Sequence, residues 1–113
     1  MKKINKEEFE KYFDKDYEHT SENNIIIDVV LDNCTPCELM YKVYQEIEED
    51  YKNITFYKIN AEEISESVDS LNIQGFPTFI MFKPGKKTRT LAGLRTKTNF
   101  KNNIERYFKD NDV

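Results

Sequence analysis

Hydrophobic and polar positions follow a different period in each part of this chain, and each period predicts an element of structure. Residues 25–31 form a short, β-branched run that is apolar on both faces, which is typical of a central strand. In the next segment apolar residues recur at helical spacing while acidic residues occupy the opposite face, which predicts an amphipathic helix of about four turns. Its apolar face comprises Met40, Val43, Tyr44, Ile47 and Tyr51.

Beyond this helix the pattern returns to strands. Residues 54–59 have strand character, and residues 64–71 then give a shorter helical face. Residues 76–82 are apolar and end at a Lys-Pro-Gly-Lys turn, after which residues 88–91 predict a second strand of a hairpin. Two antiparallel strands therefore close the predicted sheet.

Helices are also expected near both ends of the chain. Asn5 followed by Glu8 has the spacing of a capping box variant, which predicts a first helix after a very short strand at residues 2–4. Thr96 can cap a last helix, and residues 109–113 read as a polar tail. The inner faces carry Phe9, Tyr12 and Phe13 in the first helix and Phe100, Ile104, Tyr107 and Phe108 in the last. Together the elements predict an α/β fold, with a central mixed sheet of four or five strands and helices on both faces.

Composition favours one small folded domain over residues 1–113. A length of 113 residues matches a single hydrophobic core. Hydrophobic residues make up 38% and charged residues 34% of the chain, so the surface must be densely ionised and the core small. Seven Tyr and eight Phe supply large buried areas, which argues against disorder.

Charge and the length of apolar runs argue against several kinds of partner. The formal net charge of -4 disfavours a phosphate backbone, because such binding needs clustered Lys and Arg. No apolar run approaches the roughly 20 residues of a bilayer span. The lysines at the N-terminus are not followed by the apolar region of a secretory signal. We therefore expect a cytoplasmic protein that binds neither nucleic acid nor membrane. We also expect it to be a monomer.

The chain has two cysteines, Cys34 and Cys37, at the junction of the buried strand and the long helix. A zinc site needs four ligands, and the distant His19 does not complete one, so we expect no metal. A structural disulfide over four residues would contribute only about 2 kcal/mol, and a reducing cytosol would keep it open. Reversible redox chemistry is the leading interpretation.

The spacing of the two cysteines gives each a distinct chemistry. At the first position of a helix, Cys34 faces unpaired backbone N–H groups and the positive end of the helix dipole, which favours the thiolate nucleophile. Cys37 lies one turn further in, where it is shielded and can attack a mixed disulfide at Cys34. Pro36 fits the first turn because its missing N–H has no helical partner there.

Several residues in the order of a known family make the chain resemble thioredoxin. Asp28 lies six residues before Cys34, Lys58 lies in the next strand, residues 75–78 read Gly-Phe-Pro-Thr, and Gly93 ends the hairpin. The match covers about residues 24–108. The resemblance implies a thioredoxin fold, reduction of protein disulfides without a cofactor, disulfide-containing substrate proteins and a thioredoxin reductase as electron donor.

The resemblance also implies roles for two charged residues. Asp28 shares a strand face with Ile26 and Val30, so it projects into an apolar layer where its pKa should rise. The implied role is proton exchange with Cys37 through water, and an Asp at a frayed strand edge is the alternative. Lys58 could pair with Asp28, although solvent exposure is the default for an isolated strand lysine.

A further set of residues is implied to contact substrate. Pro77 cannot donate a ladder hydrogen bond, so it should begin its strand. The resemblance implies a cis bond before Pro77 and a Phe76 backbone that is offered to an extended substrate segment. Gly75 and Gly93 permit close backbone approach there, and ordinary turn geometry is the alternative.

The chain departs from the thioredoxin pattern beside the first cysteine. Thioredoxins usually carry Trp before it and Gly after it, whereas this chain has Asn33 and Thr35 and no Trp at all. With Pro36, these residues form the implied docking surface, which is altered and puts recognition by a thioredoxin reductase in question. A glutaredoxin-like, glutathione-dependent enzyme and a binding module with little turnover are the alternatives.

Overall fold

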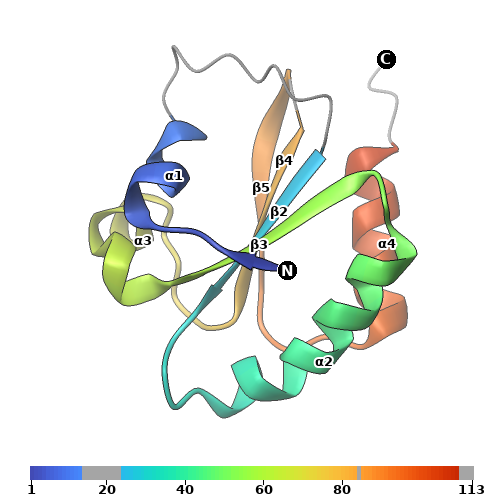
Figure 1. Ribbon diagram of the computed structural model, residues 1–113, viewed down its shortest axis with the longest axis horizontal. Coiled ribbons are helices and arrows are strands. Elements are labelled where there is room, and N and C mark those ends of the chain that lie inside the picture. Colours follow the sequence, from blue (N-terminus) through green and yellow to red (C-terminus); the bar gives the residue numbers. More distant parts are fainter. Residues whose placement is uncertain (14–23, 84, 110–113) are drawn as a thin grey trace.

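The computed structural model describes residues 1–13, 24–83 and 85–109, which form a twisted sheet with helices on both faces (Figure 1). Five strands lie in the order β1-β3-β2-β4-β5, with β1, β3 and β2 parallel and β4 and β5 antiparallel. The strands are β1 (Lys2–Lys3), β2 (Asn24–Val30), β3 (Ile54–Asn60), β4 (Thr78–Lys83) and β5 (Lys86–Ala92). The helices are α1 (Lys6–Lys11), α2 (Thr35–Asp50), the 3-10 helix η1 (Ala61–Ile64), α3 (Ser65–Ser70) and α4 (Lys97–Phe108). The predicted mixed α/β architecture is confirmed.

The central strand β2 separates two hydrophobic clusters. It pairs with β3 on one side and β4 on the other, so both of its faces are covered. Ile26 packs toward α2 and α4, whereas Ile25, Ile27 and Val29 pack toward α1 and α3. Alternate residues of a strand point to opposite faces, which explains why this strand is apolar on both faces, with Asp28 as the buried exception.

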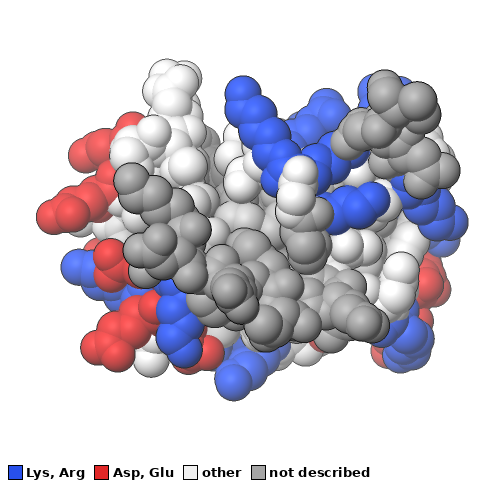
Figure 2. Space-filling model, turned by 90° about the horizontal axis from the view of Figure 1, so that it is seen from above, with Lys and Arg blue, Asp and Glu red and all other residues white. Residues whose placement is uncertain are grey.

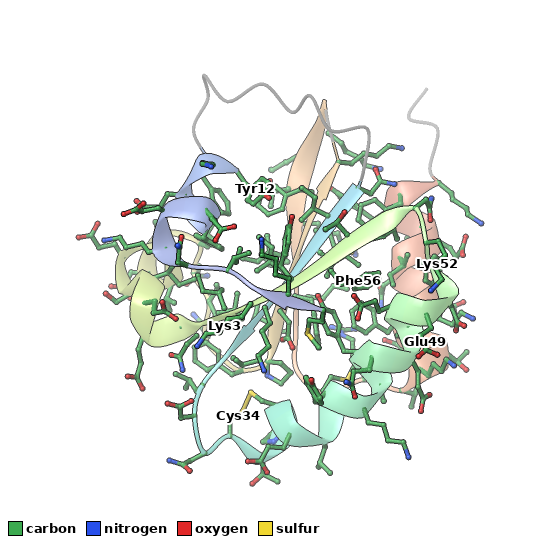
Figure 3. All side chains as sticks on the ribbon, viewed as in Figure 1. Lys3, Tyr12, Cys34, Glu49, Lys52 and Phe56 are labelled. Atoms are coloured by element: carbon green, nitrogen blue, oxygen red, sulfur yellow. A yellow bond between two sulfur atoms is a disulfide. The ribbon has the colours of Figure 1, made fainter. Side chains whose placement is uncertain are left out.

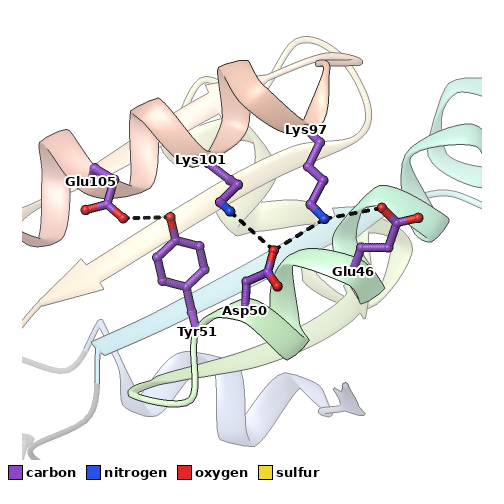
Figure 4. Close-up of polar contacts among 6 residues, drawn as sticks. All are labelled: Glu46, Asp50, Tyr51, Lys97, Lys101 and Glu105. Atoms are coloured by element: carbon purple, nitrogen blue, oxygen red, sulfur yellow. Dashed lines mark hydrogen bonds and ion pairs between the residues drawn. The ribbon is translucent and has the colours of Figure 1, made fainter.

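The long helix α2 is held against α4 by its apolar face and by polar links at its C-terminal end. Met40, Tyr44 and Ile47 are fully buried. At the C-terminal end of α2, Nζ of Lys97 lies 3.3 Å from Asp50 and 3.6 Å from Glu46 (Figure 4). Nζ of Lys101 also lies 3.3 Å from Asp50. The Tyr51 hydroxyl donates a hydrogen bond to Glu105. Hydrogen bonds from the two lysines lower the pKa of Asp50. These links lie away from the N-terminus of α2, which stays open for the site.

The predicted helix caps are present. The side chain of Asn5 accepts a hydrogen bond from the backbone N–H of Glu8 at 2.8 Å. The hydroxyl of Thr96 accepts one from Asn99 at 3.1 Å. Each cap satisfies a backbone donor that has no partner within its helix, which fixes where α1 and α4 begin.

Element boundaries differ from the sequence prediction where polar side chains or proline interrupt the pattern. Strand β4 begins at Thr78 rather than at residue 76, because Pro77 has no N–H for the ladder. Strand β5 is longer than predicted, because most of its side chains are polar and exposed, so the sequence of this edge strand has no clear hydrophobic pattern. The single helix expected over residues 64–71 is a 3-10 turn followed by the short α3. Most of the predicted polar tail lies outside the described residues.

Charged side chains are unevenly distributed on the face opposite the α2 N-terminus. Figure 2 shows acidic groups gathered on the side of α1 and α3, and basic groups toward β5 and α4.

None of the helices in the described part of the chain is both long enough and apolar enough to cross a bilayer.

Candidate active site

The two cysteines are joined by a disulfide at the junction of β2 and α2 (Figure 3). Their Cα atoms lie 5.2 Å apart. Cys34 is the N-cap of α2, so it precedes the helix rather than occupying its first position, and Pro36 lies in the first turn. The backbone N–H of Cys37 donates a hydrogen bond of 3.2 Å to Sγ of Cys34. A helix donor and the helix dipole therefore act directly on the first sulfur, as the sequence predicted.

The cysteines differ in their access to solvent. Cys34 is half-buried, whereas Cys37 is 6% exposed. An external thiol or disulfide can therefore reach the Cys34 sulfur more readily than the Cys37 sulfur.

The loop before β4 lies against the first cysteine. Sγ of Cys34 is 3.9 Å from the carbonyl oxygen of Phe76, and the Phe76–Pro77 bond is cis, as the resemblance implied. The N–H of Gly93 donates to the carbonyl of Pro77 at 2.8 Å, and the hydroxyl of Thr78 donates to the carbonyl of Gly75 at 2.6 Å. The structure thus brings together the residues that the sequence grouped as a substrate site.

The two glycines of this region have different conformations. Gly93 has a φ of 92°, in the region that favours glycine, so its turn geometry explains the residue. A Cβ at Gly75 would meet no atom within 4 Å. The packing of the described residues does not require a glycine there.

Asp28 is a buried acid in the middle of the sheet. It is 1% exposed and lies between β3 and β4, so the alternative of a frayed strand edge is wrong. Burial raises the pKa of Asp28 to about 7, and the charge of Lys58 opposes this effect. Its Oδ1 atom has no hydrogen-bond partner within the described residues.

A cavity of about 460 Å³ connects this acid to the second cysteine. Asp28 and Cys37 both line it, together with Asp32, Tyr41 and Lys58. A cavity of this size, with Asp28, Asp32 and Lys58 among its lining groups, has room for water molecules that can carry a proton between the carboxyl and the thiol.

Lys58 is beside Asp28 but does not form the ion pair that the sequence suggested. The two residues are register partners on β3 and β2. The Lys58 ammonium instead lies 5.0 Å from the ring centroid of Tyr41. The positive charge of Lys58 therefore lowers the pKa of Asp28 through space, without a direct contact. Sequence reasoning missed Tyr41, whose only signal was an aromatic one turn after Cys37 on the same helix.

Among the described residues, no three His, Cys, Asp or Glu side chains are grouped as a metal ion would require. His19, the third ligand considered from the sequence, lies outside the described residues.

The thioredoxin family model matches residues 1–106 of this chain. The chain belongs to the thioredoxin family. It is 35% identical over 71 residues to thioredoxin Asp f 29 of Aspergillus fumigatus (61% of this chain, 64% of the relative) and 32% identical over 83 residues to thioredoxin 1 of Plasmodium falciparum (74% and 79%). A solved Plasmodium falciparum thioredoxin superposes with a TM-score of 0.75 at 28% identity, covering 95% of this chain and 99% of that one. Some similar thioredoxins are chloroplastic.

Thioredoxins are protein thiol-disulfide oxidoreductases, and this chain has the linked cysteine pair that such exchange requires. This chain spans slightly less than two thirds of the length of thioredoxin Asp f 29. The family and the cysteine pair together support thiol-disulfide oxidoreductase activity.

Asn33, where this chain departs from the usual thioredoxin pattern, has a left-handed backbone conformation. Asn33 is exposed and has a φ of 56°, in the left-handed region that Asn tolerates better than bulky residues. Thr35 is exposed at the start of α2. The surface next to Cys34 is therefore polar where an indole is usual in this family.

Proposed function

We propose that this chain reduces disulfide bonds in other proteins, with Cys34 as the attacking thiol and Cys37 as the resolving thiol. The observation that carries the proposal is the asymmetry of the pair. The Cys34 sulfur is half-buried at the N-terminus of α2 and receives the Cys37 N–H, whereas the Cys37 side chain is buried. A nucleophile must be accessible and activated, whereas a resolving thiol needs only to reach its neighbour.

The proposed exchange takes two steps that conserve electrons. The Cys34 thiolate attacks one sulfur of a substrate disulfide, which forms a mixed disulfide and releases one substrate thiolate. The Cys37 thiolate then attacks the Cys34 sulfur and releases the second substrate thiolate. The substrate gains two electrons and the protein becomes the Cys34–Cys37 disulfide. Asp28, across the cavity, accepts the Cys37 proton before the second step.

The substrate site proposed around the disulfide has two sides. Asn33, Thr35 and Pro36 flank Cys34 at the start of α2. On the other side, the backbone of Gly75, Phe76 and Pro77 receives an extended substrate segment, with Gly93 adjoining it. The 3.9 Å between Cys34 Sγ and the Phe76 carbonyl oxygen supports this arrangement.

An insulin reduction assay tests the proposed activity. With dithiothreitol as the electron source, the protein should accelerate the precipitation of insulin. Reduction of the disulfides between the insulin chains separates them, and one of the separated chains is insoluble. Cys34→Ser is the matched control and should give the background rate. A wild-type rate no faster than background would favour a binding module without turnover.

We propose a thioredoxin reductase as the electron donor and a cytoplasmic monomer as the working form. Docking a reductase buries apolar surface around Cys34, and each buried Å² contributes about 25 cal/mol. Asn33→Trp should therefore increase NADPH oxidation with a generic thioredoxin reductase. Reduction by dithiothreitol should change less, since a small reagent needs no docking surface.

The left-handed backbone at Asn33 requires a control for this prediction. A residue with a Cβ and no local hydrogen bond costs roughly 1–2 kcal/mol in this region. Asn33→Ala carries that cost without the indole, so the comparison of Ala with Trp isolates the docking contribution. If Trp and Ala behave alike with the reductase, or if Trp changes both reductions by the same factor, the docking explanation is wrong.

A further inference from the structure

We infer that Tyr41 is a positioning residue, whose ring holds the ammonium of Lys58 at the cavity that joins Asp28 to Cys37. The inference rests on the proton transfer proposed above. Tyr41 lies on α2, four residues after Cys37, and its ring centroid is 5.0 Å from Nζ of Lys58. All four side chains line the same cavity.

Among the residues that the structure describes, the Lys58 ammonium has no other partner that would hold it in this place. Within the described residues Lys58 forms no ion pair, and the Oδ1 atom of Asp28 has no hydrogen-bond donor. Lys3 of β1 is its register partner and lines the same cavity, so a second positive charge lies beside it. A lysine without a partner extends its strongly hydrated ammonium into solvent. The face of an aromatic ring attracts an ammonium without neutralising its charge.

The place of this ammonium affects the proton affinity of Asp28. Asp28 and Lys58 are neighbours across β2 and β3, and the positive charge lowers a pKa that burial raises. An ammonium that moved into solvent would be further away and screened by water, so its effect would weaken. The other charged groups that line the cavity are Lys3 of β1, Asp32 after β2 and Glu38 of α2, while Cys37 carries no proton in the disulfide form. The buried Tyr44 of α2 also interacts electrostatically with Asp28.

Two substitutions separate the ring from the rest of the side chain. Tyr41→Phe keeps the aromatic face and removes the hydroxyl. Tyr41→Leu keeps an apolar side chain against the lysine stem and removes the ring. Because Tyr41 is 39% exposed, both changes leave the buried cores intact.

The test is an NMR titration of the Asp28 carboxyl carbon in the oxidised protein, which reports on the acid whether or not the protein reduces any substrate. Tyr41→Leu should raise the pKa of Asp28 by roughly 0.5, about a threefold change in its ionisation equilibrium, because the ring can bias the position of the ammonium by no more than the strength of an exposed cation–π contact. Tyr41→Phe should match the wild type. In a Lys58→Met background, Tyr41→Leu should have no effect, because the charge it positions is gone.

Either of two results overturns the inference. A pKa of Asp28 that is unchanged or lowered in Tyr41→Leu means that the ring does not hold the ammonium at the cavity. An equal rise with and without Lys58 means that Tyr41 acts on Asp28 by covering the cavity. Failure of the insulin assay alone would count against the proposed reductase activity and would leave this titration interpretable.

Discussion

Cys37→Ser is expected to accumulate a covalent mixed disulfide with a substrate protein, whereas Cys34→Ser should accumulate none. Removal of the resolving sulfur stops the exchange after its first step, while the half-buried Cys34 can still attack. The remaining thiol of Cys34→Ser is 6% exposed, so it cannot approach a protein disulfide. Incubation with an oxidised substrate protein, followed by a non-reducing gel and mass measurement of the adduct, checks this result.

The trapped species must behave as a disulfide between two defined sulfurs. Dithiothreitol should release it, and peptide mapping should place the bond at Cys34. A double variant that lacks both cysteines is the control for non-covalent association. Equal trapping by the two single variants would contradict the division of labour between the cysteines.

Most of the fold follows from local sequence patterns. The buried strand β2 and the amphipathic α2 were predicted because a covered strand and a half-exposed helix impose different hydrophobic periods. The caps at Asn5 and Thr96 are local hydrogen bonds and were also predictable. The edge strand β5 was underestimated because its side chains are largely exposed, so burial left little trace in the sequence.

The candidate site was only partly predictable, since some of its features depend on contacts between distant segments. The cysteine spacing and the buried Asp28 were evident from the chain, because each lies within a strong local pattern. The cavity, and the contact of Tyr41 with Lys58, depend on how α2 crosses β3. The left-handed backbone of Asn33 was also hidden, because Asn is common in turns of several types.

Asp28→Asn should stabilise the oxidised protein, and the gain should grow with pH. An unfolded chain loses this proton near pH 3.8, whereas burial raises the pKa of the folded carboxyl to about 7. Between these values the folded state holds a proton that the unfolded state has lost, so stability falls as the pH rises through this window. The cost is complete above pH 7 and reaches about 4 kcal/mol as an upper bound. Asparagine has the same shape and never ionises.

Urea unfolding of both oxidised proteins near pH 4 and near pH 8 measures this cost. The difference in unfolding free energy should be small at the lower pH and several kcal/mol at the higher one. Asp32→Asn is the matched control, because Asp32 lines the same cavity but is exposed. A stability gain of the same size at both pH values would mean that ionisation of Asp28 is not its source.

The same substitution should slow disulfide exchange, because the amide cannot accept the Cys37 proton. General base catalysis commonly contributes 10²–10⁴-fold, and water in the cavity can replace part of it, so we expect a loss of roughly tenfold or more at pH 7. The insulin assay and the lifetime of the mixed disulfide measure this loss from pH 6 to 9. An unchanged rate across that range would remove the proposed proton transfer. A stabilised but slower protein would show that this buried acid is unfavourable for folding and serves the exchange of thiols.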